Sequence, residues 1–187
     1  VDRRQRQMCI RDRKSSIGLT KSLWNDDKRY IDNYWSIIKD YWVHGDLASR
    51  DADGHWYLHG RSDDTIKVSG KRIGPSELES VIVKSGKAKE VAAVGIPDEN
   101  KGSKIILSIV PAENNDQKES FFEDLVIKDL GKSFKPDKVI FVKDLPKTRN
   151  MKIMRRVIKS CLANQDPGDL STLLNPESVE EIRSHAI

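Results

Sequence analysis

Residues 60–75 read Gly-Arg-Ser-Asp-Asp-Thr-Ile-Lys-Val-Ser-Gly-Lys-Arg-Ile-Gly-Pro, and this stretch decides the fold. Two short β-forming runs, 66–68 and 71–73, flank Ser69-Gly70. This pattern predicts a tight hairpin because glycine accepts the positive φ of such a turn. Pro75 then fits the first turn of a helix. The polar run that opens the stretch separates these elements from a different pattern before it, so it predicts a domain boundary.

Short strands alternate with amphipathic helices after this boundary. Apolar and β-branched runs predict strands at about 90–96, 104–110 and 139–142. Apolar residues at helical spacing predict helices from Pro75 to about Ser85, at about 118–130, from Met154 to Leu162, and from Pro176 to about Ser184. We therefore expect residues 62–187 to form an α+β domain of mixed short sheets with flanking helices.

The segment before the boundary, residues 14–61, is too small to close a core of its own. Its aromatic-rich part predicts a helix from Asp26 to about Ile37. Asp51-Ala52-Asp53-Gly54 predicts a turn between strands near 46–50 and 55–59. The same four residues resemble the start of a calcium loop, but the glutamate that ends such a loop is missing, so a turn is favoured. We expect this helix and hairpin to be the trailing edge of a larger, missing N-terminal domain.

The charge of the chain is unevenly distributed. The 187 residues include 33 Lys and Arg and 29 Asp and Glu, so the formal net charge is +4. Residues 1–13 hold five arginines and two aspartates, which accounts for +3 of that total. Such a run is typical of a basic arm for nucleic acid or anionic lipid. It lacks a periodic face, and its second half resembles translated sequencing adaptor, so we expect a disordered or artefactual segment.

Composition argues against several other classes of protein. No stretch approaches the ~20 apolar residues of a membrane helix, and no secretory signal is recognised, so we expect a cytoplasmic protein without a membrane partner. Cys9 and Cys161 lie far apart, which argues against a disulfide framework or a Cys-x-x-Cys site. His55 and His59 fall on a predicted strand with no cysteine or carboxylate to complete a site, so we assign no metal ligand.

Three polar stretches carry possible chemistry. In His44-Gly45-Asp46, a carboxylate that accepts the hydrogen bonds of a diol stands beside a glycine that lets a ligand approach. Residues 60–79 combine glycines with arginines, whose guanidinium groups can form paired hydrogen bonds with phosphate oxygens. A charged hairpin held by salt bridges would have the same composition. Residues 143–159 hold seven basic residues against Asp144, which is typical of an anion site or of a solvated basic face.

The order and spacing of these motifs resemble one family. Residues 42–48 are Trp-Val-His-Gly-Asp-Leu-Ala, the stretch 60–75 continues as Ser-Glu-Leu-Glu, and residues 146–156 are Pro-Lys-Thr-Arg-Asn-Met-Lys-Ile-Met-Arg-Arg. They look like the C-terminal motifs of AMP-forming acyl-CoA synthetases, which belong to the adenylate-forming superfamily. The aromatic segment 24–35 and the tail 168–176, Gly-Asp-Leu-Ser-Thr-Leu-Leu-Asn-Pro, resemble the acetyl-CoA synthetase branch.

The resemblance implies a two-step reaction and residues that perform it. A small carboxylic acid and ATP give an acyl-adenylate and pyrophosphate, and CoA then gives acyl-CoA and AMP. By position, Lys152 matches the catalytic lysine of adenylation and Asp46 the residue that holds the ribose. Arg61 and Arg72 match nucleotide-binding residues. The resemblance also implies Mg²⁺, for which we identify no ligand in this chain.

Further roles are implied by the same resemblance. Ser69 and Gly70 match the hairpin that lines the CoA tunnel, and Asp63 matches the hinge of a mobile C-terminal catalytic domain, residues 62–187. Residues 14–61 would then end the large AMP-binding domain. Because that domain's phosphate loop lies upstream, we expect the fragment alone to be inactive. Some relatives are silenced by acylation of the lysine that Lys152 matches, so a lysine acyltransferase is an expected partner.

One departure and two alternatives stand beside this interpretation. The family usually has Ser-Gly before the catalytic lysine, whereas this chain has Asn150-Met151, which puts the geometry of the loop in question. One alternative is an adenylating enzyme that loads a carrier protein, as peptide synthetases do, although no carrier-domain signal is present. The other is a non-catalytic basic module that binds nucleic acid, although no nucleic-acid motif is present.

Overall fold

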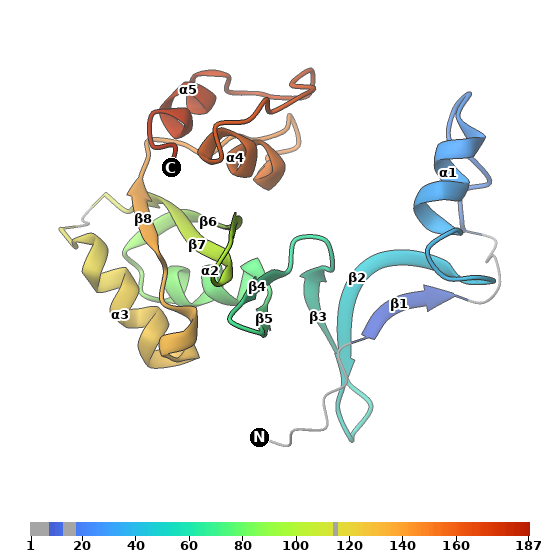
Figure 1. The fold of residues 1–187 in the computed structure, drawn as a ribbon, viewed down its shortest axis with the longest axis horizontal. Coiled ribbons are helices and arrows are strands. Elements are labelled where there is room, and N and C mark those ends of the chain that lie inside the picture. Colours follow the sequence, from blue (N-terminus) through green and yellow to red (C-terminus); the bar gives the residue numbers. More distant parts are fainter. Residues whose placement is uncertain (1–7, 13–17, 114–115) are drawn as a thin grey trace. The chain divides into compact units, whose positions relative to one another are not determined.

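The computed structural model describes the backbone of residues 8–12 and, with their side chains, residues 18–113 and 116–187 (Figure 1). Contacts divide the chain into two compact units, Val1–Asp63 and Asp64–Ile187. None of the helices within the described ranges combines the length and apolarity needed to cross a membrane.

The first unit joins a helix to an antiparallel sheet. Helix α1 (Asp27–Tyr34) begins after Asp26, whose carboxylate accepts the Arg29 N–H at 3.1 Å and caps the helix. Strands β1 (Met8–Asp12), β2 (Trp42–Arg50) and β3 (Trp56–Arg61) pair in that order. The ring of Trp42 stacks on Tyr34 with centroids 5.6 Å apart, which packs α1 against β2. The predicted turn between β2 and β3 is present, with Gly54 at φ 93°.

Several details of this unit differ from the expectation, and β2 begins at Trp42 where a strand was expected to begin near residue 46. Helix α1 ends before the predicted Ile37, because the Ser36 amide donates to Ile31 O and closes the last turn. Within the segment expected to be disordered or artefactual, residues 8–12 form a strand that pairs antiparallel with β2. Residues 1–7 and 13, which share that expectation, lie outside the described residues.

The second unit opens with the predicted hairpin. Strands β4 (Ile66–Val68) and β5 (Lys71–Ile73) pair antiparallel. The turn between them places Ser69 at φ 48° and Gly70 at φ 78°. Two positive φ values in a two-residue loop are typical of a type I′ turn, whose twist matches that of the strands. The hairpin prediction is therefore confirmed.

A three-stranded mixed sheet lies at the centre of the second unit. Strand β6 (Ala88–Asp98) pairs antiparallel with β7 (Gly102–Pro111), and β7 pairs parallel with β8 (Lys138–Phe141). A parallel pair requires a long crossover, which α3 (Glu119–Leu130) and the 3-10 helix η1 (Lys132–Phe134) supply. Helices α2 (Pro75–Lys84), α4 (Arg155–Leu162) and α5 (Glu177–Arg183) complete the unit among the described residues.

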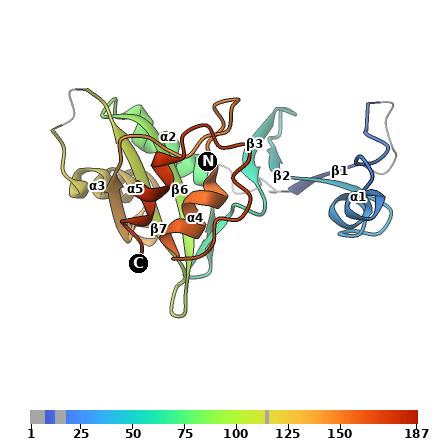
Figure 2. The ribbon, with the colours of Figure 1, turned by 90° about the horizontal axis from the view of Figure 1, so that it is seen from above.

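Helices cover both faces of this sheet, and each face has its own core (Figures 1 and 2). Helices α2 and α3 and the β4–β5 hairpin pack on one face, against residues such as Val91 and Ile105. Helices α4 and α5 pack on the other face, against residues such as Ala92 and Ile106. Successive side chains of a strand point to opposite faces, so β6 and β7 feed both cores. The predicted α+β fold is confirmed, with β6 and β7 longer at both ends than expected.

Candidate active site

In the first unit, the residues predicted to bind nucleotide lie together on the β2–β3 pair, and the predicted hinge Asp63 follows β3 directly. Asp46 and Arg61 are cross-strand neighbours, and Arg61 Nη1 lies 3.7 Å from Asp46 Oδ1. Arg61 Nε donates to Asp63 Oδ1 at 3.1 Å. His44 Nδ1 lies 2.7 Å from Asp46 Oδ2. The carboxylate and the guanidinium are therefore oriented by the protein, and both stay partly exposed.

Gly45 allows the Arg61 guanidinium to come this close. Its φ is +86°, and a Cβ at this position would lie 3.0 Å from Arg61 Nη2. Arg61 Nη1 donates to His44 O at 2.9 Å, and the Ser62 amide donates to Gly45 O at 2.8 Å. The His-Gly-Asp motif thus positions the arginine in addition to presenting Asp46.

In the second unit, Lys152 ends a tight turn that is built on Thr148. The Thr148 amide donates to Lys152 O at 2.9 Å, and the Met151 amide donates to Thr148 O at 2.8 Å. The Lys152 amide donates to Thr148 Oγ1 at 3.2 Å. Met151 has φ 61°, the left-handed conformation that favours glycine. Lys152 is exposed, and no carboxylate in the described part of the chain forms an ion pair with it.

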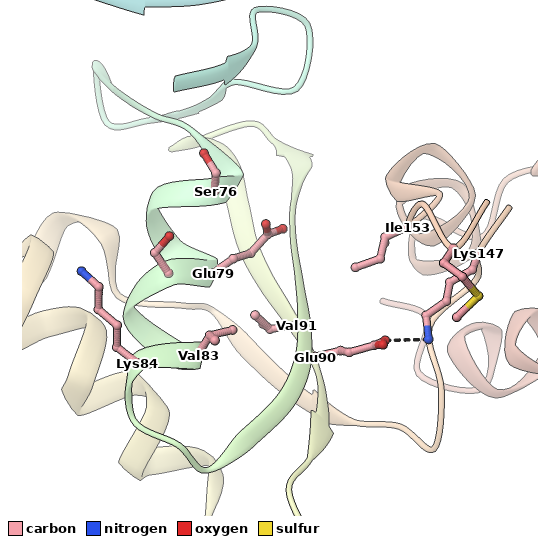
Figure 3. A pocket seen from close by; sticks show the side chains of 10 residues that line it. Ser76, Glu79, Val83, Lys84, Glu90, Val91, Lys147 and Ile153 are labelled. Atoms are coloured by element: carbon pink, nitrogen blue, oxygen red, sulfur yellow. Dashed lines mark ion pairs between the residues drawn. The ribbon is translucent and has the colours of Figure 1, made fainter. Parts of the chain in front are cut away.

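The base of this turn holds a buried lysine that the sequence reasoning did not single out. Lys147 is 6% exposed, and its Nζ lies 2.6 Å from Asp144 Oδ1 and 2.7 Å from Glu90 Oε2. Figure 3 shows Lys147 extending to Glu90 on β6. Asn175 joins the group, because its Nδ2 donates to Asp144 Oδ2 at 2.7 Å and its Oδ1 accepts the Lys147 amide at 3.0 Å. A buried ammonium is thus shared by two carboxylates from separate segments.

The protonation of this network follows from its contacts. Burial alone would lower the pKa of Lys147, but the Asp144 and Glu90 carboxylates raise this pKa above its usual value. Burial likewise opposes ionisation of Asp144, but the hydrogen bond from Lys147 brings the pKa of Asp144 below its usual value. The ionised pair is therefore the form present at neutral pH.

Two further basic residues of the 143–159 stretch are bound by the protein itself. Arg155 donates to both carboxylate oxygens of Glu79, with Nε–Oε1 2.9 Å and Nη2–Oε2 2.6 Å. Arg156 donates to the carbonyls of Pro167 and Asp169. The interpretation of this stretch as one basic face is therefore too simple, since Lys147, Arg155 and Arg156 hold the fold together and Lys152 is left exposed.

A cavity of about 470 Å³ lies between α2, β6 and the turn that carries Lys152 (Figure 3). Apolar side chains of Val83, Val91 and Ile153 line part of it, and the Lys147–Glu90 pair lies at its wall. Met151 also lines this cavity although its side chain is 60% exposed. The Lys152 turn is thus bordered by a partly apolar hollow.

Of the two CoA-binding residues predicted on the β4–β5 hairpin, Ser69 and Gly70, Ser69 lines a different hollow. The Ser69 amide donates to Lys101 O at 2.8 Å, and a Cβ at Gly70 would meet no atom within 4 Å. Arg72 lies exposed on β5, opposite Lys67. A cavity of about 430 Å³ beside Ser69 is lined by the lysines Lys101, Lys132 and Lys135. The structure thus groups Asp46, Arg61 and Asp63 in one unit and places Lys152 and the hairpin separately within the other.

One group of described side chains has the spacing of metal ligands. Ligand atoms of Asp51, Asp53 and His55, at the β2–β3 turn, lie within 4.8 Å of one another. The expectation that no carboxylate accompanies His55 is therefore wrong, since its Nδ1 lies 3.1 Å from Asp51 Oδ2. Asp51 also accepts from Tyr57 Oη at 3.0 Å, so the turn already uses this carboxylate. His59 lies apart from the group, with its Nε2 2.7 Å from Ser49 Oγ.

Comparison with known proteins gives this geometry a family context. Residues 77–152 match the family described as AMP-binding enzyme C-terminal domain. The chain is 42% identical over 172 residues to the acetyl-coenzyme A synthetase of Methanothrix thermoacetophila, covering 88% of this chain and 26% of that protein. It is 36% identical over 175 residues to the propionate–CoA ligase of Escherichia coli, covering 89% of this chain and 28% of that protein. The chain thus spans about a quarter of the length of these curated relatives.

Solved structures share the fold. The amide bond synthetase McbA from Marinactinospora thermotolerans is 27% identical, with a TM-score of 0.63 over 72% of this chain and 27% of that one. Acetoacetyl-CoA synthetase from Streptomyces lividans, at 21% identity, has a TM-score of 0.73 over 85% of this chain and 24% of that one. Residues 77–152 therefore match the AMP-binding enzyme C-terminal domain family, and the resemblance of the chain to acyl-CoA synthetases of the acetyl-CoA synthetase branch is confirmed.

Proposed function

We propose that this chain is the C-terminal part of an ATP-dependent short-chain acyl-CoA synthetase of the acetate–CoA ligase type. The whole enzyme would join a small carboxylic acid to AMP with release of pyrophosphate, and then transfer the acyl group to CoA. The observation that carries the proposal is the 42% identity, across 88% of the chain, to an acetyl-coenzyme A synthetase. We also propose that the protein acts in the cytoplasm and that a lysine acyltransferase regulates it at Lys152.

Lys152 acts in the first step of the proposed reaction. Its ammonium neutralises charge that spreads over the carboxylate and the α-phosphate as they react, and it holds the two reactants in line. Its exposure and its place at the end of a hydrogen-bonded turn support this role. A lysine already paired with a carboxylate would have to break that pair before it reached a phosphate.

The nucleotide and CoA contacts are assigned to separate elements. Asp46 accepts hydrogen bonds from the ribose hydroxyls, and Arg61 and Arg72 bind phosphate oxygens. The open space around Gly70 supports a role for the Ser69-Gly70 turn in CoA binding, since a side chain there would fill the path of the thiol arm.

Asp63 serves as the hinge in this proposal, with residues 62–187 as the mobile catalytic domain and 14–61 as the end of the AMP-binding domain. The division of contacts between Asp63 and Asp64 supports this assignment. The Asp51, Asp53 and His55 group does not fit Mg²⁺, which prefers an all-oxygen shell with several waters, so we assign no magnesium ligand to it.

The test uses the complete enzyme that carries this domain. Lys152→Ala should abolish carboxylate-dependent exchange of pyrophosphate into ATP while sparing thioester formation from supplied acyl-adenylate. Lys159→Met, which removes an exposed lysine on α4, is the matched control and should change neither step. Unchanged exchange in Lys152→Ala would overturn the proposal, and transfer to a carrier protein in place of CoA would redirect it to the carrier-loading class.

A second comparison tests the CoA assignment. Gly70 and Gly86 both have positive φ and open space where a Cβ would lie, so alanine strains both backbones alike. Gly70→Ala should slow the thioester step and leave the adenylation step intact, whereas Gly86→Ala should affect neither. Equal rates for the two variants in the thioester step would contradict the assignment of Gly70 to CoA binding.

A further inference from the structure

We propose that Lys147 is a positioning residue for Lys152: by binding Glu90 and Asp144 at once, it fixes the base of the turn that presents the catalytic lysine. The inference deepens the proposed function, because it names what holds Lys152 in place. It rests on the buried ion-pair network and on the hydrogen bonds that join this network to the turn.

The first step of the argument is that Lys147 is tied to distant parts of the chain. Its ammonium contacts Glu90 on β6 and Asp144 after β8, and it is 6% exposed. The Lys147 ammonium would be an unpaired charge out of water without these carboxylates, whereas the Asp144 and Glu90 side chains stay partly exposed, 43% and 28%. The position of Lys147 is therefore set by the central sheet of the unit.

The second step is that the tail of the chain joins the same network of contacts around Lys147. We call this network of Lys147, Glu90, Asp144 and Asn175 the clamp. Asn175 accepts the Lys147 amide with Oδ1 at 3.0 Å and donates Nδ2 to Asp144 at 2.7 Å. The Leu174 amide donates to Lys147 O at 2.8 Å, and Leu173 forms a β-bridge with Thr148. The Leu-Leu-Asn part of the tail is thus bonded to the base of the turn by backbone and side-chain hydrogen bonds.

The third step is that the clamp continues into Lys152 through backbone hydrogen bonds. Lys147 forms a β-bridge with Ile153, and the Thr148 amide donates to Lys152 O at 2.9 Å. The Met154 amide donates to Pro146 O at 2.8 Å, which adds a further bond between the two sides of the turn. A shift of Lys147 would therefore move both sides of the turn, and Lys152 with them.

The experiment on the 187-residue chain uses hydrogen exchange at single amides. Lys147→Met removes the charge and keeps much of the volume, and Asp144→Asn weakens the clamp while Lys147 keeps Glu90. We expect exchange at the Met151 and Leu174 amides to become about 10²-fold faster in Lys147→Met, because the contacts that tie the base of the turn to Glu90 and Asp144 are lost. Amides at the centre of β6 and β7 should keep their wild-type rates, and Lys147→Arg should restore most of the protection.

The outcomes separate positioning from general stability. Loop amides that keep wild-type protection in Lys147→Met would overturn the inference, and so would an equal loss of protection in the loop and the central sheet. If Lys147→Met does not fold, Asp144→Asn decides in the same way. Lys159→Met, on the exposed side of α4, is the control and should leave all of these amides unchanged.

A kinetic readout then connects the clamp to the reaction. In the complete enzyme, Lys147→Met should lower kcat for pyrophosphate exchange by about 10²-fold, as expected for a misplaced catalytic group. The KM for ATP and the thioester step should stay near wild type. Normal exchange kinetics with a loosened turn would overturn the inference. If Lys152→Ala itself exchanges normally, the proposed function fails, whereas the amide measurement still decides whether Lys147 holds the turn.

Discussion

At the scale of single residues, the left-handed backbone of Met151 is the clearest local conflict. Its φ of 61° places a side chain where the backbone of an L-residue is strained by about 1–2 kcal/mol. The side chain is 60% exposed and so recovers little by packing. The Ser-Gly of the related motif avoids this strain, since glycine has no Cβ.

Met151→Gly should therefore stabilise the chain slightly in spite of the greater freedom that glycine adds to the unfolded state. We expect the free energy of unfolding to rise by about 0.5–1 kcal/mol. This is the backbone strain that is removed minus the stability that is lost because glycine gives the unfolded chain more conformational freedom. Urea denaturation of the 187-residue chain measures it. Met151→Asn, which tolerates the same φ, should gain as well, whereas Met151→Ala should not. A loss of stability in both Met151→Gly and Met151→Asn would mean that the contacts of the Met151 side chain with other residues lining the cavity stabilise the chain by more than the backbone strain costs.

The sequence predicted Lys152 but not Lys147, and the reason is physical. Lys152 stands at a fixed place in an ordered motif, so its position alone indicated a role. Lys147 differs from the exposed Lys152 through partners that are distant in sequence, Glu90 and Asn175. Composition gives the density of charge along the chain, but folding decides which charges pair and which remain exposed.

At the scale of elements, the β4–β5 hairpin depends on a missing side chain in β6. A Cβ at Gly95 would lie 2.8 Å from Ile66 Cγ2, and Ile66 is 2% exposed. The hairpin therefore packs on the sheet at a point where only glycine leaves room.

Gly95→Ala should lower the free energy of unfolding by about 1–3 kcal/mol, because overpacking forces the hairpin away from the sheet. Urea denaturation of the chain gives the value, and Lys89→Ala, an exposed position of the same strand, is the control. In an Ile66→Ala background, which removes the opposing methyl group, the added cost of Gly95→Ala should largely vanish. An undiminished cost there would show that contact with Ile66 is not the cause.

Local pattern predicted most elements and the two hairpins, but it did not predict how strands that are distant in sequence pair. Ser69-Gly70 and the turn ending at Gly54 specify their hairpins, because the positive φ values needed are local properties. The parallel pairing of β7 with β8 and the pairing of β1 with β2 join strands that no short turn connects. Such pairings are fixed by packing and by unsatisfied strand edges, which a local pattern does not record.

At the scale of the whole molecule, the Lys147–Asp144 network makes stability depend on pH at both extremes. The pKa of Asp144 is lowered in the folded state, so its contribution is present above the usual carboxylate pKa and is lost as pH falls through the folded value. The pKa of Lys147 is raised, so its contribution is present below the usual lysine pKa and is lost as pH rises through the folded value. The network therefore contributes fully near neutral pH.

Urea denaturation between pH 3 and pH 7, a range that spans ordinary carboxylate titration, measures the acid side of this dependence. Asp144→Asn should be less stable than wild type at pH 7, and the difference should shrink as the pH falls. Asp129→Asn, an exposed position on α3, should show a much smaller difference throughout. A difference for Asp144→Asn that stays constant down to pH 3 would rule out an ionised Asp144 as its source.

The residues after Asp63 should fold without those before it. Every buried residue of the two core clusters, on both faces of the β6–β8 sheet, lies between Ile66 and Ile182. A unit that contains its whole core meets the condition for independent folding.

Residues 64–187 produced alone should unfold cooperatively, with a Tm within about 3 °C of the transition that the same residues show in the full chain. Circular dichroism gives the melting curve, and amide NMR spectra of the two proteins should overlay for the sheet residues. A segment that binds hydrophobic dyes and shows collapsed amide dispersion would mean that residues before Asp64 supply packing that these two clusters lack.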